Sequence, residues 1–174
     1  MSETTERPPV SRSGLPWIVV TVVAIVLDQL TKLWIVHNVR LFETLTLLPV
    51  LQITHTQNPG AAWSFLADAG GWQRWMFTGL ALVVSAVIVA WLRRIDTTRQ
   101  KVLPLGLTLI MGGALGNVID RLRFGHVTDF IAVHWQGHYF PAFNVADACI
   151  TVGAVLLIYD AFFEGRRERK ASST

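Results

Sequence analysis

Four long apolar runs divide the sequence into segments of different character. They cover about residues 15–36, 72–92, 102–122 and 140–163. Each run has roughly the 20 residues that an α-helix needs to cross the hydrocarbon core of a bilayer. We therefore predict a membrane all-α bundle of four transmembrane helices, in which residues 15–163 form a single membrane domain.

A different pattern lies between the first two apolar runs. Residues 51–54 alternate between apolar and polar side chains, which is the period of a β-strand, and the Asn-Pro-Gly sequence at 58–60 is typical of a turn. We predict a small extracytoplasmic β-sheet cradle over about residues 41–66. Its side chains Trp63 and Phe65 would favour a position at the lipid interface.

The chain ends and the charge distribution predict the topology. Residues 1–14 are polar and predict a disordered tail, and residues 164–174 form a basic tail. Ten of the fifteen Lys and Arg residues lie in these tails or between the second and third apolar runs. The positive-inside rule then places both termini in the cytoplasm and the sheet on the outer face.

The composition indicates which kinds of molecule the protein contacts. With 52% hydrophobic and 16% charged residues, the chain is too apolar for an ordinary soluble domain. The basic residues form short clusters beside apolar runs and not one continuous stripe. We therefore expect membrane lipids as partners and no nucleic acid.

Ionisable side chains within the predicted spans need an explanation, because they are costly in lipid and usually face a functional cavity. Asp28 and Lys32 are four residues apart on one helix face, which favours an ion pair over a direct chemical role. Asp120 could pair with Arg121 or with Lys32. For Asp120, a structural partnership and a contact with substrate are equally good interpretations.

Two other carboxyl groups, Asp129 and Asp147, have no Lys or Arg within one helical turn. We expect Asp129 in the loop after the third span and Asp147 near the start of the fourth. If folding brings them together, like-charge repulsion would make the pair share one proton, as water-based peptide hydrolysis requires. A helix-capping role explains Asp147 equally well, and spacing alone does not decide.

Histidines raise the question of a metal site. His55, His126, His134 and His138 all lie on the predicted outer side, but no His-Glu-x-x-His motif occurs and their spacing is irregular. We expect no metal and no cofactor.

Four motifs occur along the chain in a fixed order. They are DQLTK at 28–32, NPGAAWS at 58–64, GGALGNVIDRLRFGHVTDF at 112–130 and FNVAD at 143–147. Together they resemble the lipoprotein signal peptidases, the type II signal peptidases of bacteria, which are integral-membrane aspartic proteases. The resemblance extends from Leu15 to about Tyr159 and implies that Asp129 and Asp147 are the catalytic dyad.

The resemblance also implies which residues surround the dyad, what its substrate is and where in the cell it acts. Residues that would line the site are Asn58, Asn117, Arg121 and Asn144, and matching positions with mostly structural roles are Asp28, Lys32, Gly113 and Asp120. The implied substrate is a prolipoprotein whose cysteine carries diacylglyceryl, cleaved just before that cysteine. The implied location is the bacterial inner membrane, with the active site toward the periplasm.

Two other functions remain open from the residues alone. A small ion or proton transporter could use Asp28, Lys32 and Asp147 as a relay, although residues 18–26 and 83–90 carry no charge. A non-catalytic factor that binds lipidated proteins would not need the two Asp residues.

Overall fold

The computed structural model describes residues 13–60, 70–98 and 100–171. Within these residues, four long helices are each apolar enough to cross a membrane, and a small antiparallel sheet accompanies them, which confirms the predicted fold class. A short 3-10 helix, η1 (Leu15–Trp17), precedes the first of them. The long helices are α1 (Ile18–Asn38), α2 (Trp72–Leu92), α3 (Val102–Phe124) and α4 (Val145–Ala171).

Helix α3 is the centre of the bundle and packs against all three other helices. Small residues along it allow this close packing. A Cβ atom added to Gly112 would lie 2.7 Å from the Cβ atom of Ala24 on α1, and one added to Gly153 on α4 would lie 2.7 Å from Cγ1 of Ile110. The polar residues near the end of α3 are therefore held between neighbouring helices.

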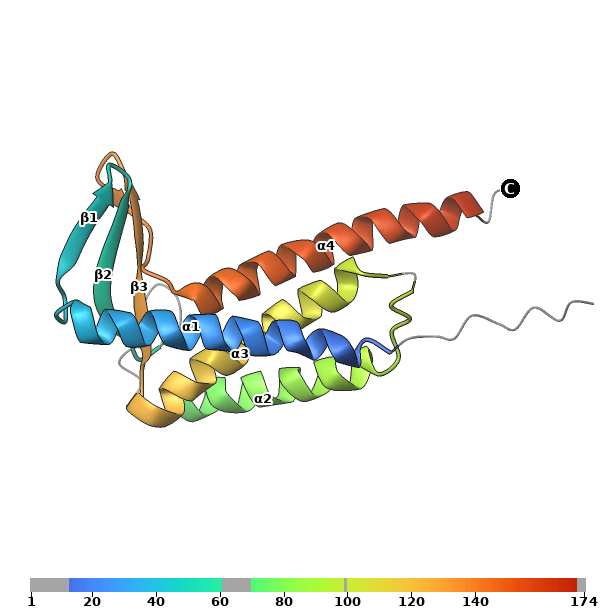
Figure 1. The fold of residues 1–174 in the computed structure, drawn as a ribbon, viewed down its shortest axis with the longest axis horizontal. Coiled ribbons are helices and arrows are strands. Elements are labelled where there is room, and N and C mark those ends of the chain that lie inside the picture. The colour runs from blue at the N-terminus through green and yellow to red at the C-terminus, as the bar shows by residue number, and fades with distance from the viewer. Residues whose placement is uncertain (1–12, 61–69, 99, 172–174) are drawn as a thin grey trace, which may run out of the picture.

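The sheet covers the end of the bundle where α1 and α3 end and α4 begins (Figure 1). Its strands lie in the antiparallel order β1-β2-β3-β4. Ile35 of α1 and Val39, the residue that follows this helix, pack against Phe130 of the sheet, which fixes the sheet to the helices. The strands are β1 (Thr44–Leu48), β2 (Leu51–Asn58), β3 (Val127–Trp135) and β4 (His138–Tyr139).

Strands β3 and β4 lie where a loop was predicted after the third span, so this prediction was wrong. Asp129 lies on β3 and not in a loop. The first four residues of β3, Val127 to Phe130, are all buried, so both faces of the strand are covered there. A strand buried on both faces lacks the alternation that reveals a half-exposed strand, and this is why the sequence pattern did not show it.

Helix α4 begins at Val145 and not at residue 140 as predicted. The preceding segment is extended, and Phe143 forms a bridge with Ile131 of β3. The N–H of Phe143 donates to the carbonyl oxygen of Ile131 at 3.0 Å, and the N–H of Ile131 donates back at 2.8 Å. This bridge places the start of α4 directly beside β3.

The predicted terminal tails are only partly described. Residues 1–12 and 172–174 lie outside the described residues, as do Trp63 and Phe65 of the predicted cradle. At the end of the predicted disordered tail, the N–H of Gly14 donates to the carbonyl oxygen of Leu92 at 2.8 Å. The backbone of α4 continues into the predicted basic tail as far as Ala171.

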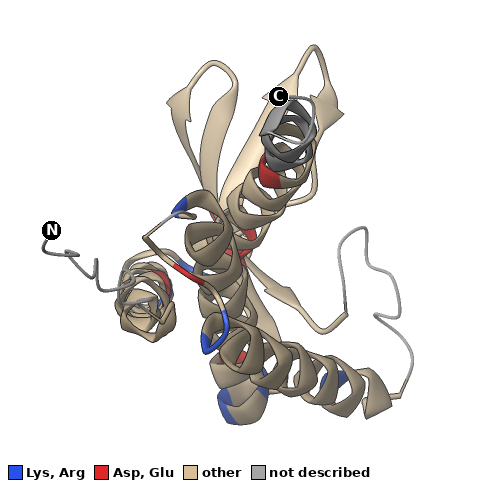
Figure 2. Ribbon diagram, turned by 90° about the vertical axis from the view of Figure 1, so that its right-hand side faces the viewer, with Lys and Arg blue, Asp and Glu red and all other residues tan. Residues whose placement is uncertain are grey.

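Both ends of the described chain lie at the end of the bundle opposite the sheet. Figure 2 views the molecule from that end and shows Lys and Arg residues on the connection between α2 and α3, where Arg93, Arg94 and Lys101 are exposed. By the positive-inside rule, we expect this end in the cytoplasm and the sheet on the opposite side.

Candidate active site

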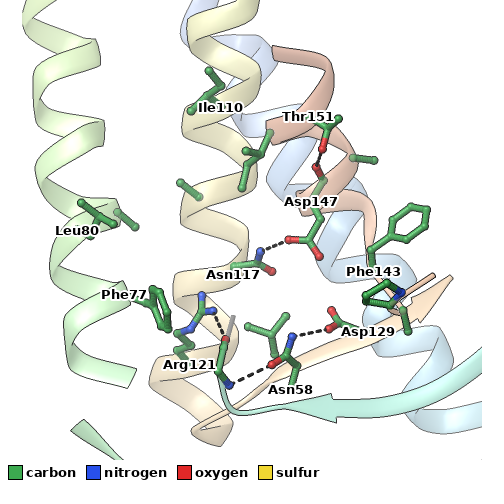
Figure 3. A pocket seen from close by; sticks show the side chains of 18 of the residues that line it. Asn58, Phe77, Leu80, Ile110, Asn117, Arg121, Asp129, Phe143, Asp147 and Thr151 are labelled. Carbon is green, nitrogen blue, oxygen red and sulfur yellow. Dashed lines mark hydrogen bonds between the residues drawn. The ribbon is translucent and has the colours of Figure 1, made fainter. Parts of the chain in front are cut away.

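A cavity of about 720 Å³ lies against α3 at the sheet end of the bundle. Helices α2 and α4 form its sides, and the sheet and the segment before α4 close one end. Apolar side chains make up most of the wall, and the polar side chains converge at the end nearest the sheet (Figure 3). These polar residues are Asn58, Asn117, Arg121, Asp129 and Asp147, whereas Thr151 lies one turn further along α4, away from the sheet.

Asp129 faces the cavity from β3 and is only 3% exposed. One carboxylate oxygen accepts a hydrogen bond from Nδ2 of Asn58 at 3.0 Å, and the other accepts one from Nδ2 of Asn144 at 2.6 Å. Burial, and then the negative charge of Asp147, raise the pKa of Asp129 to about 7, although both hydrogen bonds oppose this shift. Asp129 can therefore carry a proton near neutral pH.

Asp147 faces the same cavity from the first turn of α4. Its Oδ1 atom accepts a hydrogen bond from Nδ2 of Asn117 at 2.8 Å, and its Oδ2 atom accepts one from the backbone N–H of Asn144 at 3.3 Å. The backbone N–H of Asp147 in turn donates to Oδ1 of Asn144 at 2.9 Å, which is a reciprocal helix cap. The capping interpretation is therefore correct, and the capping carboxylate still faces the cavity.

Asn144 joins the two carboxyl groups. It is completely buried, donates to Asp129 through its amide nitrogen and accepts from the backbone of Asp147 through its amide oxygen. Its backbone N–H also donates to the carboxylate of Asp147, so a single residue contacts the carboxyl groups from β3 and α4. Such a pair can donate and accept protons at one substrate bond.

Arg121 lies at the edge of this space. Its Nη2 atom donates to the carbonyl oxygen of Gly60 at 3.2 Å, and its guanidinium group lies 5.0 Å from the ring centre of Phe77. Its Nε atom is buried and has no hydrogen-bond partner within the described residues. Arg121 lines the cavity and therefore brings a positive charge to its edge.

Three of the predicted structural residues form a buried network behind the cavity. Nζ of Lys32 lies 2.8 Å from Oδ2 of Asp28 and 3.0 Å from Oδ2 of Asp120. The predicted pair of Asp28 and Lys32 is thus present, and Asp120 pairs with Lys32 and not with Arg121. Oδ1 of Asp28 also accepts from the backbone N–H of Ala146 at 2.9 Å, which ties α1 to the start of α4.

Gly113 has a different role. It is buried on α3 against α4, where an added Cβ atom would overlap with the carbonyl oxygen of Ala146. It does not line the cavity, and its effect on the site is to let α3 and α4 approach closely.

The sequence from residue 20 to residue 163 matches the model of the signal peptidase (SPase) II family. The chain belongs to the signal peptidase II family. The lipoprotein signal peptidase of Shewanella halifaxensis is 49% identical over 158 residues, which cover 91% of this chain and 92% of the relative. That of Shewanella baltica strain OS155 is 51% identical over 156 residues, covering 90% and 91%. The resemblance inferred from the four motifs is confirmed.

Solved structures of bacterial membrane enzymes have the same fold as this signal peptidase II chain. One, determined by the in meso method at 2.3 Å, has a TM-score of 0.75 and 31% identity, and covers 84% of this chain and 87% of its own. Another, determined at 1.9 Å, has a TM-score of 0.73 and 30% identity, with coverages of 85% and 93%. Fold and family together support a peptidase role in a bacterial membrane.

Two supporting residues of this family member were missed by the sequence analysis. Nε2 of Gln29 donates to Oδ1 of Asp120 at 2.9 Å, and the hydroxyl of Thr56 donates to the backbone carbonyl of Asp129 at 3.0 Å. Gln29 could have been noticed, because a polar side chain next to Asp28 is unusual in a membrane span. Thr56 gave no signal, because its role depends on the register between β2 and β3.

The histidines do not assemble a metal centre in the part of the chain that the structure describes. No group of three or more His, Cys, Asp or Glu side chains there could hold a metal ion. Nδ1 of His55 instead lies 2.9 Å from the backbone carbonyl oxygen of Val39, to which it donates.

Proposed function

We propose that this chain is a membrane-embedded aspartic endopeptidase in which Asp129 and Asp147 are the catalytic residues. The observation that carries the proposal is that carboxyl groups from two separate elements face one cavity and share Asn144. Such an arrangement needs no covalent intermediate, because a pair of carboxyl groups can activate water directly.

The environments of the two carboxyl groups suggest their roles. Asp129, whose pKa is raised to about 7, can carry a proton near neutral pH, and in that form it donates a hydrogen bond to the scissile carbonyl oxygen. Asp147 is the carboxylate, because it lies in the first turn of α4, where the helix dipole favours negative charge. It takes a proton from water as the oxygen bonds to the carbonyl carbon. The C–N bond then breaks as Asp147 gives this proton to the departing amine and Asp129 receives the proton of the hydroxyl group from which the new carbonyl forms.

The neighbouring polar residues orient this pair and the substrate. Asn58 and Asn144 hold Asp129, and Asn117 holds Asp147. Arg121 would bind a backbone carbonyl of the substrate through its guanidinium group, since this side chain lines the cavity. The buried residues Asp28, Lys32, Gly113 and Asp120 support the site from behind.

We further propose that the substrate is a prolipoprotein with a diacylglyceryl-modified cysteine, cleaved just before that cysteine. The relatives' name, lipoprotein signal peptidase, supports this substrate class. The long apolar wall supports it as well, with Phe77, Leu80 and Val84 from α2 facing Ile150 and Val152 from α4. This wall suits acyl chains and the apolar helix of a signal peptide. The site would face the periplasm of the bacterial inner membrane.

A cleavage assay with purified protein in detergent tests this function. We expect cleavage of a diacylglyceryl-modified prolipoprotein, with the modified cysteine at the new N-terminus by mass spectrometry. The unmodified precursor serves as the control and should be cleaved poorly. EDTA should not change the rate, since carboxyl groups alone activate water. Loss of activity with EDTA, or binding of the substrate without cleavage, would disprove the proposal.

The dyad also predicts a dependence of cleavage on pH. Because the pKa of Asp129 is raised to about 7, the protonated acid is present below that pH and is lost as the pH rises through it. We expect kcat/KM to fall about tenfold for each pH unit above about 8. Measuring initial rates from about pH 5 to 9, with return to pH 6 as a control for unfolding, checks this. A rate that stays constant up to pH 9 would contradict the role of Asp129 as the acid.

A further inference from the structure

Lys32 has an unusual environment for a lysine, because its ammonium group is buried and fully paired. Lys32 is only 4% exposed, although it lies within α1. Its Nζ atom donates to Oδ1 of Asn117 at 2.9 Å in addition to its two carboxylate partners, Asp28 and Asp120. An ammonium group has three N–H bonds, and here each has an acceptor.

The contact with Asn117 determines which way the amide of that residue points. An ammonium group can only donate, so the side of Asn117 that faces Lys32 must be its oxygen atom. The same oxygen lies 3.3 Å from Nδ2 of Asn144, which is also a donor. The NH₂ group of Asn117 therefore points in the other direction, and it donates to Oδ1 of Asp147 at 2.8 Å.

The position of Lys32 is itself fixed by its carboxylate partners. Asp28 is held by the backbone N–H of Ala146 at 2.9 Å, and Asp120 is held by Gln29 at 2.9 Å and by the backbone N–H of Thr128 at 3.2 Å. These donors come from α1, β3 and the start of α4. Lys32 therefore cannot move without disturbing contacts between three elements.

We propose that Lys32 is a positioning residue for catalysis, which orients the amide of Asn117 so that its N–H donates to the Asp147 carboxylate. This inference rests on the proposed function of the dyad. Lys32 would then affect the rate of the chemical step as well as the stability of the bundle. With the amide turned around, the oxygen of Asn117 would face the carboxylate and repel it.

The test needs a background that tolerates loss of the lysine, because removing it alone leaves two buried carboxylates without a cation. Asp28→Asn removes one of them and leaves Lys32 bonded to Asn117 and Asp120. The informative comparison is between Asp28→Asn and the double variant Asp28→Asn/Lys32→Met. These proteins differ only at Lys32, and methionine retains a long unbranched side chain.

We expect Lys32→Met in this background to lower kcat by about 10- to 100-fold, the range found when a hydrogen-bonding partner that orients a metal-binding side chain is removed. KM should stay within about twofold, because Lys32 does not line the cavity. The same comparison on an Asn117→Leu background should show almost no further loss in kcat, since the amide is then absent. This non-additivity separates positioning through Asn117 from a general structural effect.

The proposal would be overturned if Asp28→Asn and Asp28→Asn/Lys32→Met had equal kcat. It would also be overturned if Lys32→Met lowered kcat by the same factor on the Asn117→Leu background. Thermal unfolding in detergent shows whether each variant folds. If the double variant does not fold, Asn117→Asp decides the question, since it keeps an acceptor for Lys32 and removes the donor to Asp147. Full activity of Asn117→Asp would overturn the proposal, and a loss of at least 10-fold would support it.

Failure of this inference is distinguishable from failure of the proposed function. Asp129→Asn is assayed beside the Lys32 variants. If it retains activity, the dyad itself is wrong. If it is inactive while the Lys32 variants keep full kcat, the dyad stands and only the positioning role of Lys32 is rejected.

Discussion

Asp129→Asn and Asp147→Asn are each expected to reduce cleavage of a lipidated prolipoprotein by at least about 1,000-fold, because general acid–base catalysis typically contributes factors of this order. An amide at position 129 cannot supply an acidic proton, and one at position 147 cannot take a proton from water. Both residues are proposed to act on one water molecule. The double variant should therefore be little worse than either single variant.

Asp160→Asn is the matched control for these two variants. It makes the same chemical change on α4, at a residue that does not line the cavity. We expect Asp160→Asn to cleave at the rate of the unmodified protein in a gel-shift assay. Substantial cleavage by Asp129→Asn or Asp147→Asn, with product matching the normal site, would reject the dyad. Thermal unfolding of each variant shows that lost activity does not reflect lost folding.

Gly113→Ala is expected to have the second-largest effect, although Gly113 does not touch the cavity. The added methyl group would overlap with the carbonyl oxygen of Ala146 and lie 2.7 Å from Cγ1 of Ile150. Helix α4 would have to move away from α3, which carries Asn117. The 2.8 Å hydrogen bond from Asn117 to Asp147 would lengthen as a result. Overpacking of this kind costs about 1–3 kcal/mol, and a shift of about 1 Å at reacting groups can cost about 100-fold in rate.

Gly79→Ala provides the control for this packing argument. Gly79 is an exposed residue of α2, and an added Cβ atom would meet nothing within 4 Å among the described residues. We expect Gly79→Ala to keep the rate and the unfolding temperature of the unmodified protein. Gly113→Ala should lower both, as measured by cleavage and by thermal unfolding in detergent. An unchanged rate and unfolding temperature in Gly113→Ala would show that α3 and α4 adjust without moving the site.

Asp129 lies on a paired strand, which fixes the position of its side chain. The backbone N–H of Phe130 and that of Ile131 both donate to the carbonyl oxygen of Phe143, just before α4. The backbone of Asp129 itself is paired with Thr56 of β2. A side chain carried by a paired strand keeps its position better than one on a free loop. The sheet therefore sets the distance between β3 and α4 that the proposed dyad requires.

Much of the fold could be read from the sequence because it depends on local properties. Whether a segment spans a membrane depends on its own length and apolarity, and α2 occupies the predicted residues 72–92. The pair of Asp28 and Lys32 follows from helical spacing in the same way. The four motifs also identified the family, which the comparisons confirm.

The parts of the fold that the sequence did not predict depend on contacts between distant segments. Strand β3 is covered on both faces where Asp129 lies, so no alternation marked it in the sequence. The segment before α4 is extended because it pairs with β3, although its residues are apolar enough to continue a span. Here tertiary pairing overrides local preference.

The candidate site likewise depends on contacts between distant segments of the chain. Residue spacing pointed to Asp129 and Asp147 as carboxyl groups without nearby cations but could not choose between caps and catalysis, and only the family resemblance favoured catalysis. Their partners come from far along the chain, since Asn58 is 71 residues from Asp129 and Asn117 is 30 residues from Asp147. Hydrogen bonds form only at about 3 Å and in suitable directions. Residue type and spacing could therefore nominate these side chains, whereas only the packing of β2, β3, α3 and α4 decided which of them meet.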